Sequence, residues 1–410
     1  TMEVMKRTAE KHGLVCLLHE KPYEGINGSG KHNNWSLSTN TGVNLLDPDR
    51  EPAKNLQFML FLAATMKAVD VYGDLLRVSV ATAGNDHRLG GNEAPPAIVS
   101  MFIGDDLASV LDIIEADAES EAKELVTMTA GPKVLPHFVK DTTDRNRTSP
   151  FAFTGNKFEF RMPGSSLSVS GPNVILNTAV ADSLGAFADR LEKVPVGKLE
   201  EEIHTLLKEV IRAHRRIVFN GNGYTEDWVK EAGRRGLFNL PACADAFPCF
   251  IAEKNIALFT KHHVFTREEI FSRYEIMQEN YVKTINIEAK TMCSMMYKTF
   301  LPSLLSYIET IAEATEKTKK VLPSAPVISQ EKLLSTLARL YTSISEMTEE
   351  LKSAIAGADS IGDSMEKVRY FNYTVLAKMN GLRSFVDEAE ALIPESFLTY
   401  PTYDKLLFSI

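Results

Sequence analysis

This chain is organised around one glycine-rich loop, residues 24–36, with the sequence Glu24-Gly25-Ile26-Asn27-Gly28-Ser29-Gly30-Lys31-His32-Asn33-Asn34-Trp35-Ser36. Its three glycines allow positive φ angles and let the backbone approach a ligand closely. The apolar run at 14–18 precedes the loop and predicts a strand. We therefore expect a ligand to lie over this loop.

The loop partly fits the phosphate-binding pattern G-x-x-x-x-G-K, through Gly25, Gly30 and Lys31. Position 32 is His, however, where that motif needs a Ser or Thr hydroxyl for Mg²⁺. Residues 33–38 also lack the pattern of a helix start, so a P-loop is disfavoured. Taken alone, the loop is also compatible with a plain structural turn.

The composition is that of an ordinary soluble globular protein. The chain has 410 residues, 44% hydrophobic and 24% charged, enough for about two or three domains. Its net charge of −9 argues against nucleic-acid binding, and no run of about 18 apolar residues predicts a membrane span. The four cysteines form no C-x-x-C pair, so neither a zinc site nor a disulfide framework is indicated, and we expect a cytoplasmic location.

The sequence pattern changes near residue 195, which predicts a domain boundary between residues 194 and 195. Residues 1–194 mix short strands, Gly/Pro-rich loops and helices, which predicts an α+β domain. Residues 195–410 are mostly helical. Apolar residues recur there at heptad spacing over 333–351 and 368–389, which predicts an antiparallel helical hairpin. Packing alone explains both stripes.

Two loops could bring charged groups to a ligand on the glycine-rich loop. The loop at 87–96 offers Arg88, whose guanidinium suits a carboxylate or phosphate, and Glu93, which a mobile lid could carry. The loop at 144–148 adds two arginines, although a basic surface turn is the structural alternative there.

A predicted strand at 157–161 completes this set. Alternation places Lys157, Glu159 and Arg161 on one face, although a solvated sheet edge would look the same. With His32, the inventory is one His, two Glu and several cationic groups, which is typical of phosphoryl transfer with Mg²⁺ or Mn²⁺.

Four motifs, in this order, resemble those of glutamine synthetase. They are Asn27-Gly28-Ser29-Gly30-Lys31-His32, Arg88-Leu89-Gly90-Gly91-Asn92-Glu93-Ala94-Pro95, Asn146-Arg147-Thr148-Ser149 and Lys157-Phe158-Glu159-Phe160-Arg161. Their extended forms resemble the type III family more specifically. The resemblance covers essentially the whole chain. It implies part of a catalytic domain, an antiparallel sheet with helices, over 1–194, and the helical C-terminal extension of that family over 195–410.

The resemblance implies roles for the residues that match the motifs. His32 and Glu159 would bind the metal nearer the γ-phosphate of ATP. The substrate glutamate would contact Asn27, Gly28 and Arg88.

The remaining implied roles concern the nucleotide and the chemical step. Ser36 and Lys157 match positions that contact the nucleotide. Glu93 would be the flap acid that closes the site and helps to deprotonate ammonium. Arg147 and Arg161 would stabilise the transferring phosphoryl group and the γ-glutamyl phosphate.

For the complete protein, the implied activity is ATP-dependent ligation of ammonia to L-glutamate through γ-glutamyl phosphate, a step of nitrogen metabolism. ATP would be the co-substrate and Mg²⁺ or Mn²⁺ the cofactor. The family also implies a homo-oligomer, a dodecamer of stacked rings. Two alternatives stay open: another carboxylate–amine ligase or guanidine kinase on the same scaffold, and a non-catalytic fragment kept for assembly.

The sequence departs from the family pattern at several places. The usual His-x-His is His32-Asn33-Asn34, so the second His is lost, and Ala152 stands where an arginine is common. Residues 105–143 form an insertion. The remaining metal carboxylates and a small N-terminal β-domain of the family lie upstream of the glycine-rich loop by more than the residues available here. We therefore expect this chain to be the C-terminal part of a longer protein.

We predict that residues 1–410 by themselves do not make glutamine, because they would supply only part of the metal-binding set. The measurement is ATP- and ammonia-dependent glutamine formation by the isolated 410-residue chain. Measurable turnover would contradict the prediction.

Overall fold

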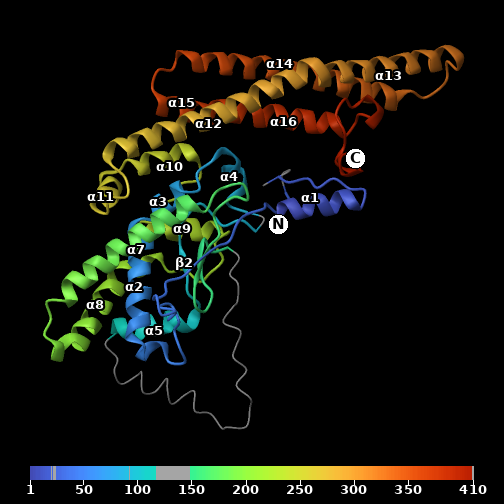
Figure 1. The fold of residues 1–410 in the computed structure, drawn as a ribbon. Helices are drawn as coiled ribbons and strands as arrows, with labels where there is room; N and C mark the ends of the chain where they lie inside the picture. The colour runs from blue at the N-terminus through green and yellow to red at the C-terminus, as the bar shows by residue number, and fades with distance from the viewer. Residues whose placement is uncertain (20, 22–24, 92, 117–147, 409–410) are drawn as a thin grey trace, which may run out of the picture. The chain divides into compact units, whose positions relative to one another are not determined.

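A computed structural model of the chain describes residues 1–19, 21, 25–91, 93–116 and 148–408. The chain forms two compact units (Figure 1): a helical unit of residues 1–18 and 275–410, and a sheet unit of residues 19–274. Helices predominate in both, and a small sheet lies in the sheet unit, so the α+β prediction is confirmed. None of the helices in these ranges is long and apolar enough to cross a membrane.

The sheet has four short strands in the order β1 (Asn33–Trp35), β4 (Phe158–Phe160), β3 (Phe151–Phe153), β2 (Met101–Phe102). Strand β4 pairs antiparallel with β1 and β3, whereas β2 and β3 are parallel. The sheet is therefore mixed, where an antiparallel sheet was expected. The departure lies at β2, because two strands that pair in parallel cannot be joined by a hairpin turn.

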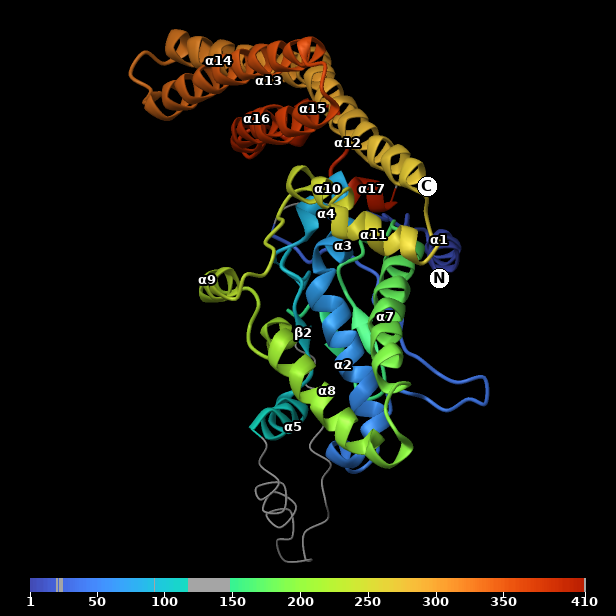
Figure 2. The same ribbon diagram turned by 90° about the vertical axis from the view of Figure 1, so that its left-hand side faces the viewer.

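One face of this sheet is aromatic and packs on helices. The rings of Phe151 and Phe158 stack with their centroids 4.6 Å apart. The ring of Phe153 packs against that of Phe58 of α2 (Leu56–Val71), with the centroids 5.9 Å apart. Helix α7 (Ser170–Leu191) runs along α2 (Figure 2). Helix α2 is buried around most of its circumference, as its apolar sequence requires.

The sheet unit also contains α3 (Gly73–Val78), α4 (Ala83–Arg88), α5 (Asp105–Ala116), α8 (Leu199–His214), α9 (Glu226–Arg234), α10 (Cys243–Phe250) and α11 (Glu253–Lys261). Helix α8 is amphipathic and packs against α2. Residues 195–274 therefore pack with the preceding α+β part. The predicted boundary between residues 194 and 195 separates two domains of a protein family. The packing of helices in this chain does not test such a boundary, so it stays a prediction.

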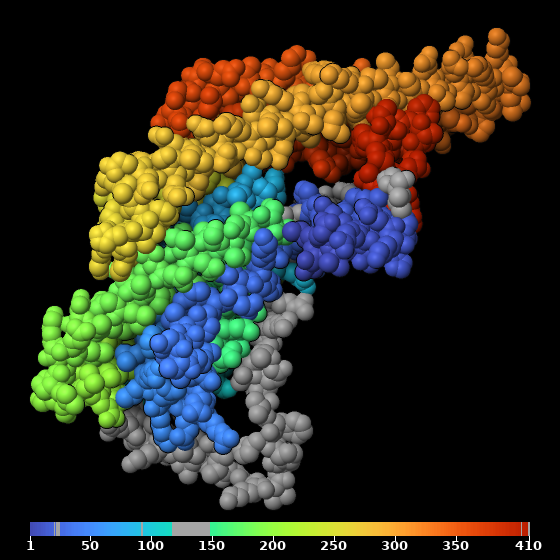
Figure 3. Space-filling view, in the orientation of Figure 1, coloured from blue at the N-terminus to red at the C-terminus, as the bar shows by residue number. Residues whose placement is uncertain are grey.

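The helical unit contains most of α12 (Arg267–Met295), which begins in the sheet unit, together with α1 (Met2–Lys11), α13 (Leu301–Val321), α14 (Ile328–Gly357), α15 (Ser364–Tyr370), α16 (Leu376–Glu390) and α17 (Tyr403–Phe408). Two π-helical segments, η4 (Met296–Phe300) and η6 (Phe371–Val375), interrupt them. Figure 3 shows α12 to α14 as one continuous surface.

Side-chain contacts define how α14 meets α15 and α16. Tyr370 Oη donates to Ala354 O, Lys378 pairs with Glu350, and Arg339 pairs with Glu388. Residue numbers rise on one side as they fall on the other, so these helices run in opposite directions. Most of their buried residues belong to the two heptad stripes, including Leu340, Ile344, Leu351, Leu382 and Val386.

Some local predictions were wrong or too long. Residues 14–18 form no strand, and Leu14, Leu17 and Leu18 are exposed. A strand needs a second strand to pair with, and an apolar run of five residues does not show whether one is present. The sequence pattern also predicts a strand over 98–103, of which the structure forms only the two residues of β2. The pattern over 105–124 predicts a helix, which α5 confirms up to Ala116, and residues 117–124 lie outside the described residues.

We predict an acid-sensitive contribution to stability from Asp182, which ties α7 to the end of α11. Burial raises the pKa of this carboxyl, but hydrogen bonds from Lys261 (2.6 Å) and His262 (3.0 Å) outweigh burial and leave the pKa below its ordinary value of 3.8. A lowered carboxyl pKa stabilises the fold above the unfolded-state pKa, and that stability is lost as pH falls through the folded-state pKa.

Asp182→Asn should therefore lower the free energy of unfolding at pH 7 by about 1 kcal/mol and flatten its decline below pH 4, about the unfolded-state value. Urea unfolding across pH measures both effects. Asp189→Asn, an exposed change on the same helix, is the control. Equal unfolding curves for the two variants would refute the assignment.

Candidate functional site

Glu159 lies at the centre of the sheet on the face opposite the aromatic cluster. Its direct cross-strand neighbours are Asn34 on β1 and Ala152 on β3. Side chains directly opposite one another share a face, so these three do. Asn34 and Ala152 are the positions at which the sequence lacks the usual His and Arg. Both departures therefore flank Glu159 directly.

Two nitrogen-bearing side chains meet the Glu159 carboxylate. Arg161 Nε donates to Oε2 at 3.0 Å, and Arg161 Nη2 lies 3.0 Å from the same oxygen. His32 Nδ1 lies 3.6 Å from it. Arg161 is buried, whereas the His32 side chain is 56% exposed. An imidazole, a carboxylate and a guanidinium thus converge, with the imidazole open to solvent.

His32 and Glu159 together could supply part of the ligand set of a divalent metal ion. One imidazole nitrogen and one carboxylate suit Mn²⁺ or Mg²⁺. Over the described ranges, no group of three or more His, Cys, Asp or Glu side chains could hold a metal ion. His32 and Glu159 would therefore serve as part of a larger ligand set.

The buried side chain of Arg88 packs against the glycine-rich loop at Gly30. Its Nη1 donates to Met162 O at 2.8 Å and Asn85 Oδ1 at 3.2 Å, and its Nη2 donates to Arg161 O at 3.2 Å. A Cβ atom on Gly30 would lie 2.0 Å from Nη2. The loop can pass over this buried guanidinium only because position 30 is glycine.

Lys31 also has a structural contact in this arrangement. Its backbone N–H donates to Pro163 O at 2.9 Å, and its Nζ donates to Leu167 O at 2.6 Å. Gly30 and Gly164 form a bridge alongside. The lysine that gave the loop its P-loop appearance therefore ties the loop to residues 163–167.

Ser36 and Lys157 lie together where β1 ends and β4 begins, since Trp35 pairs with Phe158 in antiparallel register. The Ser36 hydroxyl donates to Asn44 Oδ1 at 2.9 Å and is 3.2 Å from Asn156 O. Lys157 is half-buried. The two predicted nucleotide-contacting residues are thus adjacent.

The remaining predicted site residues lie on loops. Glu93 is exposed with φ 68°, in a loop that the Gly90 N–H closes by donating to Pro95 O at 3.0 Å. Asn27 is exposed, and Gly28 is half-buried. Arg147 lies outside the described residues.

Tyr224 is a neighbour of the Glu93 loop that the sequence did not indicate. Burial raises the pKa of its phenol, the charge of Glu93 adds to this, and a hydrogen bond with the Glu93 backbone opposes it. The adjacent Gly223 N–H donates to Thr148 Oγ1 at 2.8 Å, and a Cβ there would lie 3.3 Å from Pro96 Cγ. The sequence Asn220-Gly221-Asn222-Gly223 predicts only a turn. The end of that turn and Tyr224 thus contact both the Glu93 loop and Thr148.

Comparison with known proteins points to one family. The family model described as "Glutamine synthetase, catalytic domain" matches residues 1–94, and that described as "Glutamine synthetase C-terminal domain" matches residues 202–319. The chain is 47% identical to a glutamine synthetase of Butyrivibrio fibrisolvens over 412 aligned positions, covering 100% of this chain and 58% of the relative.

Over its whole length, the chain is thus similar to a glutamine synthetase. Two further relatives agree: a type-3 glutamine synthetase of Dictyostelium discoideum, 41% identical, and a glutamine synthetase of Bacteroides fragilis, 37% identical. They cover 99% and 100% of this chain, and 56% and 57% of their own lengths. The chain therefore spans somewhat more than half the length of the glutamine synthetases it matches.

We predict that Gly30→Ala destabilises the sheet unit by about 1–3 kcal/mol. The new methyl group would collide with Arg88, which is only 3% exposed and held by two backbone carbonyls, so it cannot move aside without losing them. Urea unfolding measures the change.

Gly185→Ala is the matched control, because nothing lies within 4 Å of a Cβ at that exposed position in α7. Alanine should there stabilise the helix by about 0.5–1 kcal/mol. The close approach of Gly30 to Arg88 would be refuted if both variants changed the unfolding free energy alike.

Proposed function

We propose that the complete protein containing this chain is a type III glutamine synthetase. It would ligate ammonia to L-glutamate at the expense of ATP, giving L-glutamine, ADP and phosphate. The alignment of the whole chain with proteins named as glutamine synthetases supports this, and one of them is named type-3. The convergence of His32, Glu159 and Arg161 on one sheet face is the observation that carries it.

The reaction would proceed in two steps. A γ-carboxylate oxygen of glutamate attacks the γ-phosphorus of ATP, and ADP leaves. Ammonia nitrogen then attacks the γ-carbonyl carbon, and phosphate leaves. Negative charge develops on the transferring phosphoryl group and then on the carbonyl oxygen, so fixed cationic groups lower both barriers.

The residues of this chain would divide these tasks. Arg161 is fixed by Glu159 and would face the phosphoryl oxygens, with Arg147 assisting. The Glu93 loop would exclude water, which otherwise hydrolyses an acyl phosphate, and its carboxylate would accept a proton from ammonium. Tyr224 would stabilise that loop through its contact with the Glu93 backbone.

Residues of the glycine-rich loop and of the start of β4 would contact the substrates. Asn27 and Gly28 would seat glutamate, and Ser36 with Lys157 would contact the nucleotide. Arg88 would hold the glutamate carboxylate only after exchanging one of its carbonyl contacts, since its guanidinium already donates to Met162 O and Arg161 O.

His32 and Glu159 would hold a Mg²⁺ or Mn²⁺ ion together with ligands from elsewhere in the protein. When bound, that ion would offset phosphate charge. We further propose a cytoplasmic homo-oligomer, a dodecamer of stacked rings, in which α14 to α16 form the helical hairpin of the C-terminal extension. No contact within the described ranges favours another carboxylate–amine ligase, a guanidine kinase or a non-catalytic role.

Replacing His32 and Lys31 in the full-length protein tests these roles. His32→Ala should raise the Mg²⁺ concentration for half-maximal glutamine formation about tenfold or more, because it removes a metal ligand. Lys31→Ala should change it far less, because Lys31 Nζ contacts only the Leu167 carbonyl among the contacts described. Steady-state assays across Mg²⁺ concentration provide the comparison, and equal effects would contradict the proposal.

A further inference from the structure

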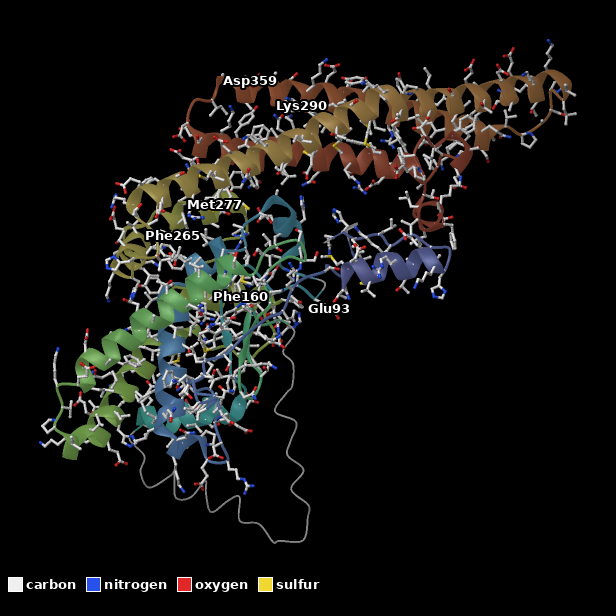
Figure 4. All side chains as sticks on the ribbon, viewed as in Figure 1. Glu93, Phe160, Phe265, Met277, Lys290 and Asp359 are labelled. Atoms are coloured by element: carbon white, nitrogen blue, oxygen red, sulfur yellow. The ribbon has the colours of Figure 1, made fainter. Side chains whose placement is uncertain are left out.

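A cavity of about 520 Å³ lies within the helical unit, and none of the proposed site residues lines it. Its walls come from α12, from the end of α14 and from the start of the helix that contains α15 and η6, all between residues 282 and 371. Figure 4 labels Lys290 and Asp359, which line it. This volume is in the range of sites that hold small metabolites.

The cavity carries a net positive charge in a chain whose net charge is −9. Lys290, Lys352 and Lys367 line it, against Asp359. Lys352 lies 3.7 Å from Glu349. Over the described ranges, neither Lys290 nor Lys367 has a carboxylate at ion-pair distance. Two lysines are thus available to an anion.

Asn286 adds a polar group that lacks a partner. Its Oδ1 is buried in the cavity wall and has no hydrogen-bond partner. A buried acceptor without a partner costs free energy, which a ligand hydroxyl or N–H group would recover. Nearby apolar side chains, Val282, Ile355 and Phe371, would cover the carbon skeleton of such a ligand.

The backbone is unusual at this place as well. Tyr297 belongs to the π-helical segment η4 and Phe371 to η6, and both line the cavity. Single π-helical turns are rare and are frequent at functional sites. Burial and the hydrogen bond to Glu349 raise the pKa of Tyr297 to about 12, so its hydroxyl adds no negative charge at neutral pH.

We propose that this cavity binds a small hydroxylated organic anion. Lys290 and Lys367 would hold its acidic group, and its hydroxyl group would donate to Asn286 Oδ1. A phosphorylated polyol and a hydroxy-polycarboxylate share this chemistry, and the two are separated by the probes below. This binding does not depend on the function proposed above.

Isothermal titration calorimetry on the full-length protein tests the proposal with glycerol 3-phosphate and citrate as probes. ATP, glutamate, ammonia and metal ions are left out, so that the result does not depend on catalysis. We expect saturable binding of at least one probe below about 10 mM, and none of glycerol, which lacks the acidic group. The tighter probe identifies the acidic group as phosphate or carboxylate.

The double variant Lys290→Gln/Lys367→Gln should weaken that binding about tenfold or more. Asn286→Leu should weaken it as well, and Lys298→Gln should not, because Lys298 is exposed in η4 but does not line the cavity. The lysine changes are at exposed or half-buried positions and should leave folding intact. Absence of saturable binding, wild-type binding by the double variant, or an equal loss in Lys298→Gln would overturn the proposal.

Discussion

The alternation of side chains along β4 is the constraint on which this site depends. Phe158 and Phe160 fix the strand by packing into the aromatic core, and Glu159 between them must then face the other way. A shift of one residue would bury the carboxylate and expose both rings, which the hydrophobic effect opposes strongly. Packing on one face therefore holds Glu159 beside Arg161 and His32 on the other.

The glycine-rich loop depends on the same strand through Arg88. Its guanidinium donates to backbone carbonyls directly after β4 and occupies the space that a side chain at Gly30 would fill. The loop is thus held by a buried cation and by the Lys31 contact to Leu167 O, while His32 remains accessible. These contacts make the loop a fixed edge of the site.

Sequence could predict the parts that depend on local pattern. Alternation at 157–161 predicts the two faces of β4, and the heptad spacing of apolar residues over 333–351 predicts α14. The carbonyl partners of Arg88 and the approach of Tyr224 to the Glu93 loop could not be foreseen, because each joins segments distant along the chain. The π-helical turns around the cavity have no distinctive residue pattern, and the exposed run at 14–18 resembles a strand in composition alone.

The most direct test of glutamine synthesis through γ-glutamyl phosphate follows oxygen in the full-length protein. Glutamate labelled with oxygen-18 in its γ-carboxylate is turned over with ATP and ammonia, and the released phosphate is analysed by mass spectrometry. Attack of that carboxylate on ATP predicts transfer of the label from glutamate to phosphate. Glutamine formation with unlabelled phosphate, or ATP cleavage without glutamine, would contradict the account.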